Sequence, residues 1–283
     1  MNKVSVICAF YNEEKYIKEL LDSIFEQTYE SIELICIDDG STDNSAEIVK
    51  KYILPFEERG YELKYIYQAN QGQAAATNNA LKVITGKYLC WIDGDDYWYP
   101  DAIERKVVFL EENPEFGIVT SDFHMLYENE NRQMERKADI YGRLNYQTNQ
   151  FELAISGESI IENLAQMIRV DFLRKINPDM NISLCREGQN YQLLLPMLYY
   201  YKRGYVDVPL GCYRIHTDSH CHQERSIDEK LERFDALLEM LRETLHSIGL
   251  GEEEILHLVK RSTFYMEKGR FMENAGIKQM VRK

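Results

Sequence analysis

Hydrophobic positions within residues 1–100 follow two different spacings. Short runs rich in β-branched residues are typical of strands, and apolar residues three or four positions apart are typical of helices. The pattern predicts four strands, at residues 4–9, 32–37, 63–67 and 87–92. It predicts helices between them, with apolar faces that include Leu20 and Leu21, then Ile48 and Val49, then Ala80 and Val83. Strands that alternate with helices predict an α/β fold with a mostly parallel sheet.

Polar residues follow each of the four predicted strands. The segments are Phe10-Tyr11-Asn12, Asp38-Asp39-Gly40, Gln68-Ala69-Asn70 and Asp93-Gly94-Asp95-Asp96. Ligands of parallel α/β sheets gather beyond the carboxyl ends of the strands, so we expect all four segments at one rim. The glycine patterns of dinucleotide-binding and P-loop proteins are absent from this sequence. A phosphate ligand would therefore need another counter-charge.

The last segment places three carboxylates around one glycine. Crowded carboxylates repel one another unless a cation or a donor lies among them, so Asp93-Gly94-Asp95-Asp96 suggests a divalent metal site. The alternative is an ordinary Asp-Gly turn at the surface. An EF-hand is excluded, because Tyr97 stands where the third oxygen ligand should be. The rim shared with Tyr11 and Asp39 favours the metal site over the turn.

Composition narrows the class of protein. The 283 residues carry a formal net charge of -14, which argues against a nucleic-acid binder, although acidic proteins can hold phosphates through a cation. The six cysteines show no paired spacing, as expected in a reducing compartment. The longest apolar cluster, 193–201, is too short to span a bilayer, and no signal-peptide pattern precedes the first strand. We therefore expect a folded cytoplasmic protein.

Four motifs lie in order within residues 1–120: VSVICAFYNEE, SIFEQTYESIELICIDDGSTDNS, NQGQAAATNNAL and GKYLCWIDGDDYWYPDAIE. Together they resemble the nucleotide-binding half of family 2 glycosyltransferases, which have the GT-A fold, a Rossmann-like sheet flanked by helices. The resemblance implies transfer of a sugar from a nucleoside diphosphate sugar, expected to be a UDP-sugar, to an acceptor hydroxyl with inversion. It also implies a divalent cofactor, Mn2+ or Mg2+, and a glycan or lipid-linked acceptor in surface polysaccharide or glycoconjugate synthesis.

A nucleotidyltransferase is the competing enzyme class, because it also holds a metal with acids at sheet ends. Such an enzyme normally has a glycine-rich and basic loop near the N-terminus. Phe10-Tyr11-Asn12-Glu13-Glu14 offers neither, so the sequence favours the glycosyltransferase.

The resemblance assigns roles to residues at the strand ends. It implies that Ala9 and Tyr11 line the nucleoside pocket, that Asp39 binds the base, and that Asp93 faces the ribose or the donor sugar. The full set expected to bind the nucleotide sugar is Ala9, Tyr11, Asp38, Asp39, Asn70, Gly72, Asn78, Asp93, Gly94 and Arg214, with Arg214 at the diphosphate. The expected metal ligands are Asp95, Asp96 and His216, and Asp95 also belongs to the catalytic residues.

The acceptor half departs from the family pattern. Gln189 and Asn190 stand where members usually have an acidic pair, and an amide cannot accept a proton at neutral pH. Glu187 is the nearest substitute for the catalytic base. The alternatives are Asp122, or a donor-binding or scaffold subunit without turnover. Thr77 also replaces an arginine that is frequent in the family.

Two further hypotheses concern aromatic and metal-binding residues. Trp98 follows the acidic segment closely enough to stack on a sugar, so we expect it in the acceptor site with Gln189 and Asn190. A zinc knuckle is an alternative for the segment that ends the catalytic half, although no second ligand pair stands at finger spacing. Its ligands would be Cys212, His216, His220, Cys221 and His222.

The chain is expected to divide at residue 222. Residues 1–222 would form the catalytic domain, with a donor half at 1–120 and an acceptor half at 121–222, and 223–283 would form a helical extension. Residues 259–283 contain seven Lys or Arg and two Glu, a local charge of +5. A basic, amphipathic end could lie on the inner face of an anionic membrane. The alternative, which we favour slightly, is a helical lid or a contact between two copies in a homodimer.

Overall fold

The computed structural model describes residues 1–128, 135–136, 149–185, 187–216 and 225–275. Within these residues the chain has the predicted α/β fold, built on one sheet of nine strands. Eight strands follow the order β3-β2-β1-β4-β8-β6-β9-β5, and β7 pairs with β6. The strands are β1 Val4–Phe10, β2 Ile32–Asp38, β3 Glu62–Tyr67, β4 Tyr88–Trp91, β5 Tyr97–Trp98, β6 Phe116–Tyr127, β7 Glu135–Arg136, β8 Gln166–Arg169 and β9 Lys202–Ile215.

Helices alternate with the strands in the first part of the chain, as the sequence predicts, and consecutive helices follow in the second part. The helices are α1 Ile17–Phe25, α2 Ser45–Lys51, α3 Ile53–Arg59, α4 Gln73–Leu81, α5 Ala102–Glu112, α7 Gln150–Ser156, α8 Val170–Ile176, α9 Gln189–Tyr200, α10 Ile227–Ser247, α11 Glu252–Arg261 and α12 Thr263–Asn274. A 3-10 turn, η1, covers Asn163–Ala165. Each of the four strands predicted from residues 1–100 is present, with ends that differ by at most one residue from the prediction.

The first half of the sheet is parallel and the second half is mixed. β1 pairs in parallel with β2 and β4, and β2 pairs in parallel with β3, because helical crossovers return the chain to the same edge. β8 lies antiparallel between β4 and β6. β9 runs parallel to β6 and carries β5 antiparallel on its outer edge. The antiparallel placement of β8 and β5, which pair with strands far away in the sequence, accounts for the departure from a wholly parallel sheet.

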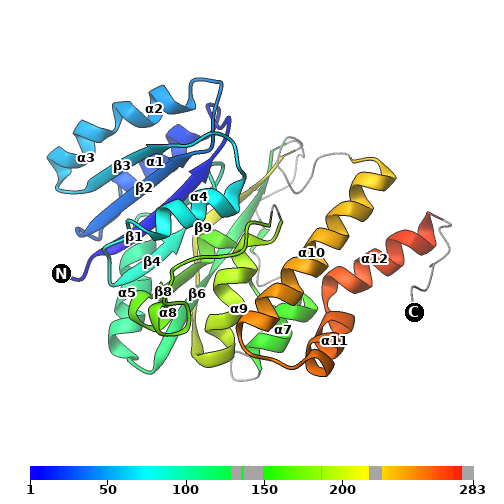
Figure 1. Ribbon diagram of the computed structural model, residues 1–283. Coiled ribbons are helices and arrows are strands. Elements are labelled where there is room, and N and C mark those ends of the chain that lie inside the picture. Colours follow the sequence, from blue (N-terminus) through cyan, green and yellow to red (C-terminus); the bar gives the residue numbers. More distant parts are fainter. Residues whose placement is uncertain (129–134, 137–148, 186, 217–224, 276–283) are drawn as a thin grey trace.

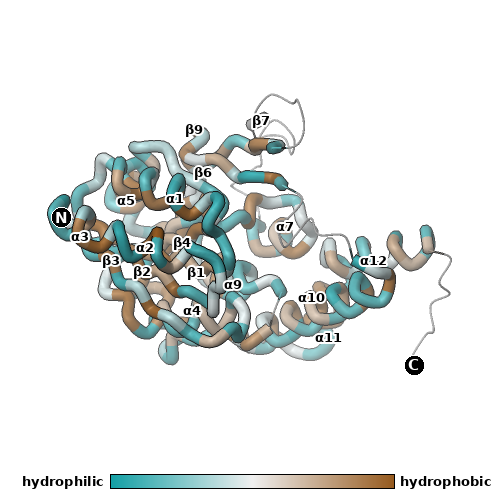
Figure 2. Tube along the Cα trace, turned by 90° about the horizontal axis from the view of Figure 1, so that it is seen from above, coloured by the Kyte–Doolittle hydropathy of each residue, from teal (hydrophilic) through white to brown (hydrophobic). Residues whose placement is uncertain are grey.

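Helices cover both faces of the sheet (Figure 1). On one face α1, α3 and α5 bury apolar residues such as Leu20, Phe56 and Val107 against the strands. On the other face α4, α7 and α9 do the same, and the core continues without interruption into α10 and α11 through residues such as Leu241 and Ile255. In Figure 2 the helices α10–α12 extend away from the sheet, and hydrophilic and hydrophobic residues alternate along them. None of the helices that the structure describes is long and apolar enough to cross a membrane.

β9 approaches α5 so closely that one strand position must be glycine. A Cβ built on Gly204 would lie 2.0 Å from two ring atoms of Phe109, which α5 holds against the sheet. Real side-chain atoms do not come this close, so any larger residue would push β9 away from α5. The far end of the same strand carries Arg214 and the chain then reaches His216, so this contact helps to fix two of the predicted site residues.

The Gly204→Ala substitution should lower the free energy of unfolding by about 1–3 kcal/mol, the usual cost of overpacking a core. The measurement is a denaturant titration followed by circular dichroism. Gly251→Ala is the control, since a Cβ at Gly251 meets no atom within 4 Å. That variant should stay within about 0.5 kcal/mol of wild type. Equal stability of the two variants would contradict the packing constraint.

Candidate active site

The carboxyl ends of β1, β2, β3 and β4 meet at one rim, as the sequence predicts. The four strands are neighbours and run in the same direction. Two backbone hydrogen bonds extend the pairing past the strands: Asp39 N–H donates to the Phe10 carbonyl and Gln68 N–H donates to the Asp38 carbonyl, each at 2.9 Å. The polar segments therefore leave the sheet from fixed positions.

The two aspartates after β2 organise the loops of the rim. Asp39 accepts hydrogen bonds at 2.8 Å from the Gln68 side chain and from the backbone N–H groups of Gln71 and Gly72. A carboxylate has about four acceptor sites, so Asp39 keeps about one for a ligand. Asp38 is 1% exposed and accepts from Tyr65 Oη at 2.7 Å and from the Ser41 N–H at 2.7 Å. Asp38 is therefore buried within the loop, and its contact with the nucleotide stays a prediction.

The segment after β3 turns into α4 at Gly72. Its φ of 89° and ψ of 163° are backbone angles that only glycine adopts readily, and its N–H reaches Asp39. Asn70 is exposed beside the loop that follows β2. Asn78 lies farther along α4 and is 5% exposed. Its side-chain amide donates to and accepts from the backbone of Ile182, both at 2.8 Å, so Asn78 joins α4 to a distant segment and is not available to the nucleotide.

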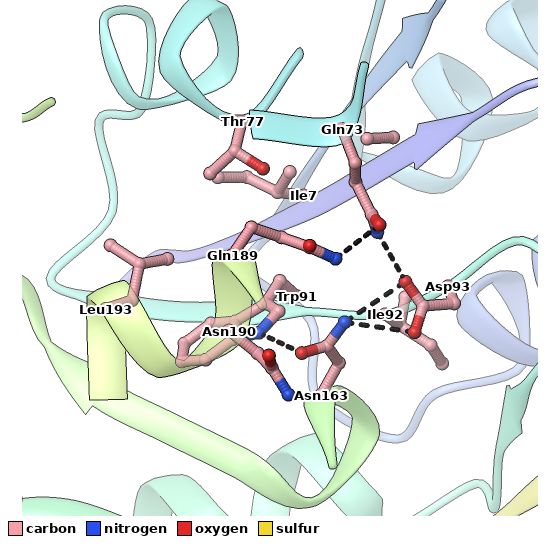
Figure 3. Close-up of a pocket in the computed structure, with 11 residues that line it drawn as sticks. Ile7, Gln73, Thr77, Trp91, Ile92, Asp93, Asn163, Gln189, Asn190 and Leu193 are labelled. Atoms are coloured by element: carbon pink, nitrogen blue, oxygen red, sulfur yellow. Dashed lines mark hydrogen bonds between the residues drawn. The ribbon is translucent and has the colours of Figure 1, made fainter. Parts of the chain in front are cut away.

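Asp93 lies in a network of neutral amides (Figure 3). Gln73 Nε2 donates to Asp93 Oδ1 at 2.7 Å, and Asn163 Nδ2 donates to both Asp93 carboxylate oxygens at 3.0 and 3.1 Å. Asn163 Oδ1 accepts from the Trp91 indole N–H at 2.7 Å. Gln189, at the first position of α9, donates to the Gln73 carbonyl oxygen. The network thus crosses from the donor half to the acceptor half.

A further carboxylate, Glu13, lies against the acidic segment. A Cβ on Gly94 would come within 2.9 Å of Glu13 Cγ, so Gly94 allows the close approach of the two segments. Burial and the neighbouring charges of Asp95 and Asp93 raise the pKa of Glu13 to about 8. Three carboxylates therefore face one another at the rim with too little positive charge between them.

Asp95 and His216 fit a divalent cation. Asp95 Oδ2 lies 3.0 Å from His216 Nε2, although the two residues are far apart in the sequence. Carboxylate oxygen and imidazole nitrogen are both accepted by Mn2+, and the charge crowding around Glu13 is what a cation would relieve. Within the described part of the chain no group of three or more His, Cys, Asp or Glu residues is gathered as a ready metal site. The diphosphate and water would supply the remaining ligands.

Asp96 and Arg214 support the acidic segment from behind. Asp96 is 1% exposed, its Oδ1 accepts from the Arg214 backbone N–H at 2.9 Å, and burial raises its pKa well above the usual range. The Arg214 guanidinium donates to the Asp95 carbonyl at 3.0 Å and forms ion pairs with Glu128 at 2.9 Å and with Glu19. Asp96 is thus buried, with no hydrogen-bond partner for its Oδ2 among the described residues, and Arg214 is paired with two carboxylates; their roles toward a metal and a diphosphate stay predictions.

Trp98 is a core residue rather than a sugar platform. It is 2% exposed, and its indole donates to the Leu164 carbonyl at 2.8 Å. The buried ammonium of Lys106 donates to the same carbonyl at 2.7 Å. Trp98 was expected to contact the acceptor, and that expectation is wrong. It instead holds η1, the turn that presents Asn163 to Asp93.

The predicted acceptor residues have different surroundings. Gln189 and Asn190 both line the pocket next to Asp93. Asn190 also donates from its side chain to the Ile161 carbonyl at 3.2 Å. Glu187 is not among the lining residues, and its carboxylate accepts from Arg233 Nε at 2.9 Å. Asp122, the alternative base, is 0% exposed and is excluded by its burial.

The pocket itself is a cavity of about 10 Å³, with space for roughly one water molecule. Ala9 and Thr77 lie on its donor side, and Tyr11 is 47% exposed at the rim. Its lining residues are Ile7, Ala9, Gln73, Thr77, Trp91, Ile92, Asp93, Asn163, Gln189, Asn190 and Leu193. Asp93 is the one ionisable residue in this lining.

For the zinc knuckle, His220, Cys221 and His222 lie outside the described residues.

Sequence reasoning missed Gln73, Asn163 and Glu13. Glu13 was visible as an acid directly after the first strand, within three residues of Phe10. Gln73 follows Gly72 at the start of a helix, a position from which a side chain can reach the rim. Asn163 carries no local signal, because its role depends on the pairing of β8 with β4 far away in the chain.

Comparison with known proteins identifies relatives of the first half. The chain is 41% identical over 110 residues to glycosyltransferase GlyA of Streptococcus pneumoniae, which covers 38% of this chain and 15% of that protein. It is 39% identical over 118 residues to the putative glycosyltransferase EpsE of Bacillus subtilis, which covers 41% of each. The chain spans less than half the length of these curated relatives.

Solved structures share the fold over nearly the whole chain. One is S. aureus TarS 1-349 in complex with UDP-GlcNAc, with a TM-score of 0.68 and 18% identity over 94% of this chain and 72% of that one. Another is the mannosyltransferase PcManGT from Pyrobaculum calidifontis in complex with GDP-Man and Mn2+, with a TM-score of 0.65 and 18% identity over 97% of this chain and 75% of that one. At this identity the likeness concerns the GT-A fold alone.

The family model described as glycosyl transferase family 2 matches residues 5–176, which include all four strand-end segments and the turn with Asn163. With the fold and the rim described above, this match establishes the family predicted from the four motifs. The chain belongs to glycosyl transferase family 2.

Proposed function

We propose that this chain transfers a sugar from a nucleoside diphosphate sugar to an acceptor hydroxyl with inversion. The observation that carries the proposal is the pair Asp95 and His216, 3.0 Å apart at the rim beside Asp93. TarS binds UDP-GlcNAc and PcManGT binds GDP-Man with Mn2+, so nucleotide sugars are the donors to test first, and we propose a UDP-sugar. The acceptor would be a glycan or a lipid-linked molecule in surface polysaccharide or glycoconjugate synthesis.

The donor nucleotide would lie across the ends of β1, β2 and β3. Tyr11 is exposed and offers an aromatic face to the base, and Ala9 leaves space beneath it. The remaining acceptor site of Asp39 can bind a base N–H. In this arrangement Asn70, Gly72 and Gly94 shape the loops around the nucleotide through their backbone.

Asp95 and His216 would hold Mn2+ or Mg2+, which supplies Lewis-acid stabilisation of the departing diphosphate. Arg214 contributes indirectly, because its bond to the Asp95 carbonyl and its backbone bond to Asp96 keep the acidic segment in place. Asp93 would accept hydrogen bonds from hydroxyl groups of the donor, since its carboxylate faces the pocket.

Gln73 and Gln189 both line the pocket and are bonded to each other across it. We propose that the donor sugar separates these two amides and takes their hydrogen bonds, because hydroxyl groups can replace both the donor and the acceptor of the pair. Asn190 would then contact the acceptor side. Glu187 would accept the acceptor proton, in the role predicted from its position before α9, with Arg233 holding its carboxylate.

A second candidate function is a donor-binding subunit without turnover. The specific observation in its favour is that Gln189, at a position where the resemblance implies an acid, is a neutral amide bonded to a second neutral amide, Gln73. The pocket then contains one carboxylate, Asp93, which is already held by Gln73 and Asn163. The two candidates share donor binding and differ in the fate of the donor.

Asp95→Asn should reduce affinity for UDP in Mn2+ by at least about tenfold, the lower end of the cost of losing even an outer-shell partner of a metal. Isothermal titration of UDP with Mn2+ present, and again with EDTA, measures this effect. The control is Asp179→Asn, an exposed acid far along the chain, which should bind UDP as wild type does. The proposal would be contradicted if neither EDTA nor the Asp95 substitution changed the affinity for UDP.

Glu187→Gln should reduce kcat for UDP release from UDP-GlcNAc, UDP-glucose or UDP-galactose by about 10²–10⁴, the usual contribution of a general base. The KM for the donor should change little, because Glu187 does not line the donor pocket. Glu158→Gln, at an exposed position, is the matched control. Unchanged turnover would remove Glu187 from the mechanism. A wild-type chain that binds UDP-sugar without releasing UDP, and that gains turnover on Gln189→Glu, would favour the donor-binding subunit.

A further inference from the structure

The helical extension contacts the segment that leads into α9. We call this segment the strap, and it comprises residues 182–185 and 187–188. Arg233 of α10 donates from Nε to Glu187 Oε2 at 2.9 Å, and the Cys185 thiol donates to the Ala236 carbonyl at 3.6 Å. Ser183 Oγ donates to the carboxylate of Glu243, farther along α10. These contacts follow α10 over ten residues, so the strap lies along the helix.

Packing at Gly188 reinforces these polar contacts. Gly188 is the N-cap of α9 and has a φ of 69°, in the left-handed region that favours glycine. A Cβ at this position would lie 2.4 Å from Met240 Cε, so the backbone of Gly188 rests directly on α10. Met240 and Leu241 are fully buried in the core that α9 and α10 share. The start of α9 therefore has little freedom to move independently of α10.

The strap also ends at the candidate active site. The two residues that follow Gly188 are Gln189 and Asn190, and both line the pocket. At its other end, Ile182 is bonded through its backbone to Asn78 of α4. α10 lies beyond residues 5–176, the part that the family model matches. A helix outside the matched region thus sets the place of two pocket residues.

We propose that α10 acts as a clamp on the acceptor side of the pocket, with Arg233 as a positioning residue that acts through Glu187. The inference rests on the proposed glycosyl transfer for its catalytic consequence, but the clamp itself is a property of α9 and α10. Arg233 is 27% exposed and Glu187 is 12% exposed, so water screens this ion pair only in part. Without the guanidinium, the Glu187 carboxylate loses its ion pair to α10, and the segment before α9 loses one of its anchors.

Arg233→Met should lower kcat for UDP release by about ten- to a hundredfold, the range that a small misplacement of reacting groups costs. The affinity for UDP with Mn2+ should stay within about twofold of wild type, because the donor rim lies on other elements. Arg233→Lys keeps the positive charge on a shorter side chain, so its kcat should lie between those of Arg233→Met and wild type. Arg242→Met is the control, since Arg242 lies on the same helix and forms no ion pair or hydrogen bond within the described residues.

A double substitution tests whether Arg233 acts through Glu187. The variant that combines Arg233→Met and Glu187→Gln should be no slower than Glu187→Gln alone. If Arg233 acts only through Glu187, the effects of the two substitutions on kcat are not additive. Additive losses of kcat in the double variant would show that Arg233 does not act through Glu187. Equal losses in UDP affinity and in kcat would show a general loss of structure, and would overturn the positioning role.

Amide hydrogen exchange tests the clamp without any need for turnover. Arg233→Met should speed exchange at residues 191–195 of α9 by about tenfold relative to wild type, while the strands β1 to β4 keep their protection. Arg242→Met should leave both regions unchanged. If the wild-type chain releases no UDP, the proposed function fails, and this exchange measurement still decides on the clamp. Unchanged exchange in α9 would overturn it.

Discussion

Repulsion between carboxylates at the sheet rim is the constraint on which the rest of the site depends. Asp93, Asp95, Asp96 and Glu13 come together from two strand ends, and each carboxylate has different neighbours. Asp93 is held by amides, Asp95 lies beside an imidazole, and buried Asp96 accepts a backbone N–H. Glu13 lacks such a partner among the described residues and its pKa is raised to about 8. The excess negative charge favours the binding of a cation at the rim.

Neutral amides, rather than charges, connect the two halves of the pocket. Gln189, Gln73 and Asn163 form a path from α9 to Asp93. Amides can donate and accept at once, so the same network can hold a carboxylate in the empty site and hydroxyl groups in an occupied one. Gln189 and Thr77 both line this pocket as neutral residues, so Asp93 is the one ionisable residue in its lining.

The sequence was sufficient to predict the sheet rim and the family, because both depend on local patterns. Strands at 4–9 and 32–37 could be recognised from their apolar runs, and their parallel order follows from the helices between them. The surroundings of Trp98 and Arg214 do not follow from local patterns. Their residue types suit sugars and phosphates, but the burial of Trp98 beside Leu164 depends on the pairing of β5 with β9, and the ion pair of Arg214 with Glu128 depends on the pairing of β6 with β9. Side chains of the second half are placed by such long-range pairings, which a single sequence does not reveal.

The core that continues from α9 into α10 has a consequence for how this protein could have diversified. Leu194 and Leu195 of α9 are 0% exposed, as are Met240 and Leu241 of α10, and all four belong to one apolar cluster. A chain cut near residue 222 would present that surface to water and tend to aggregate, because exposed apolar patches of this kind bind one another. The extension therefore cannot be exchanged between relatives like a detachable module. Any new C-terminal sequence has to be inherited together with a matching face on α9.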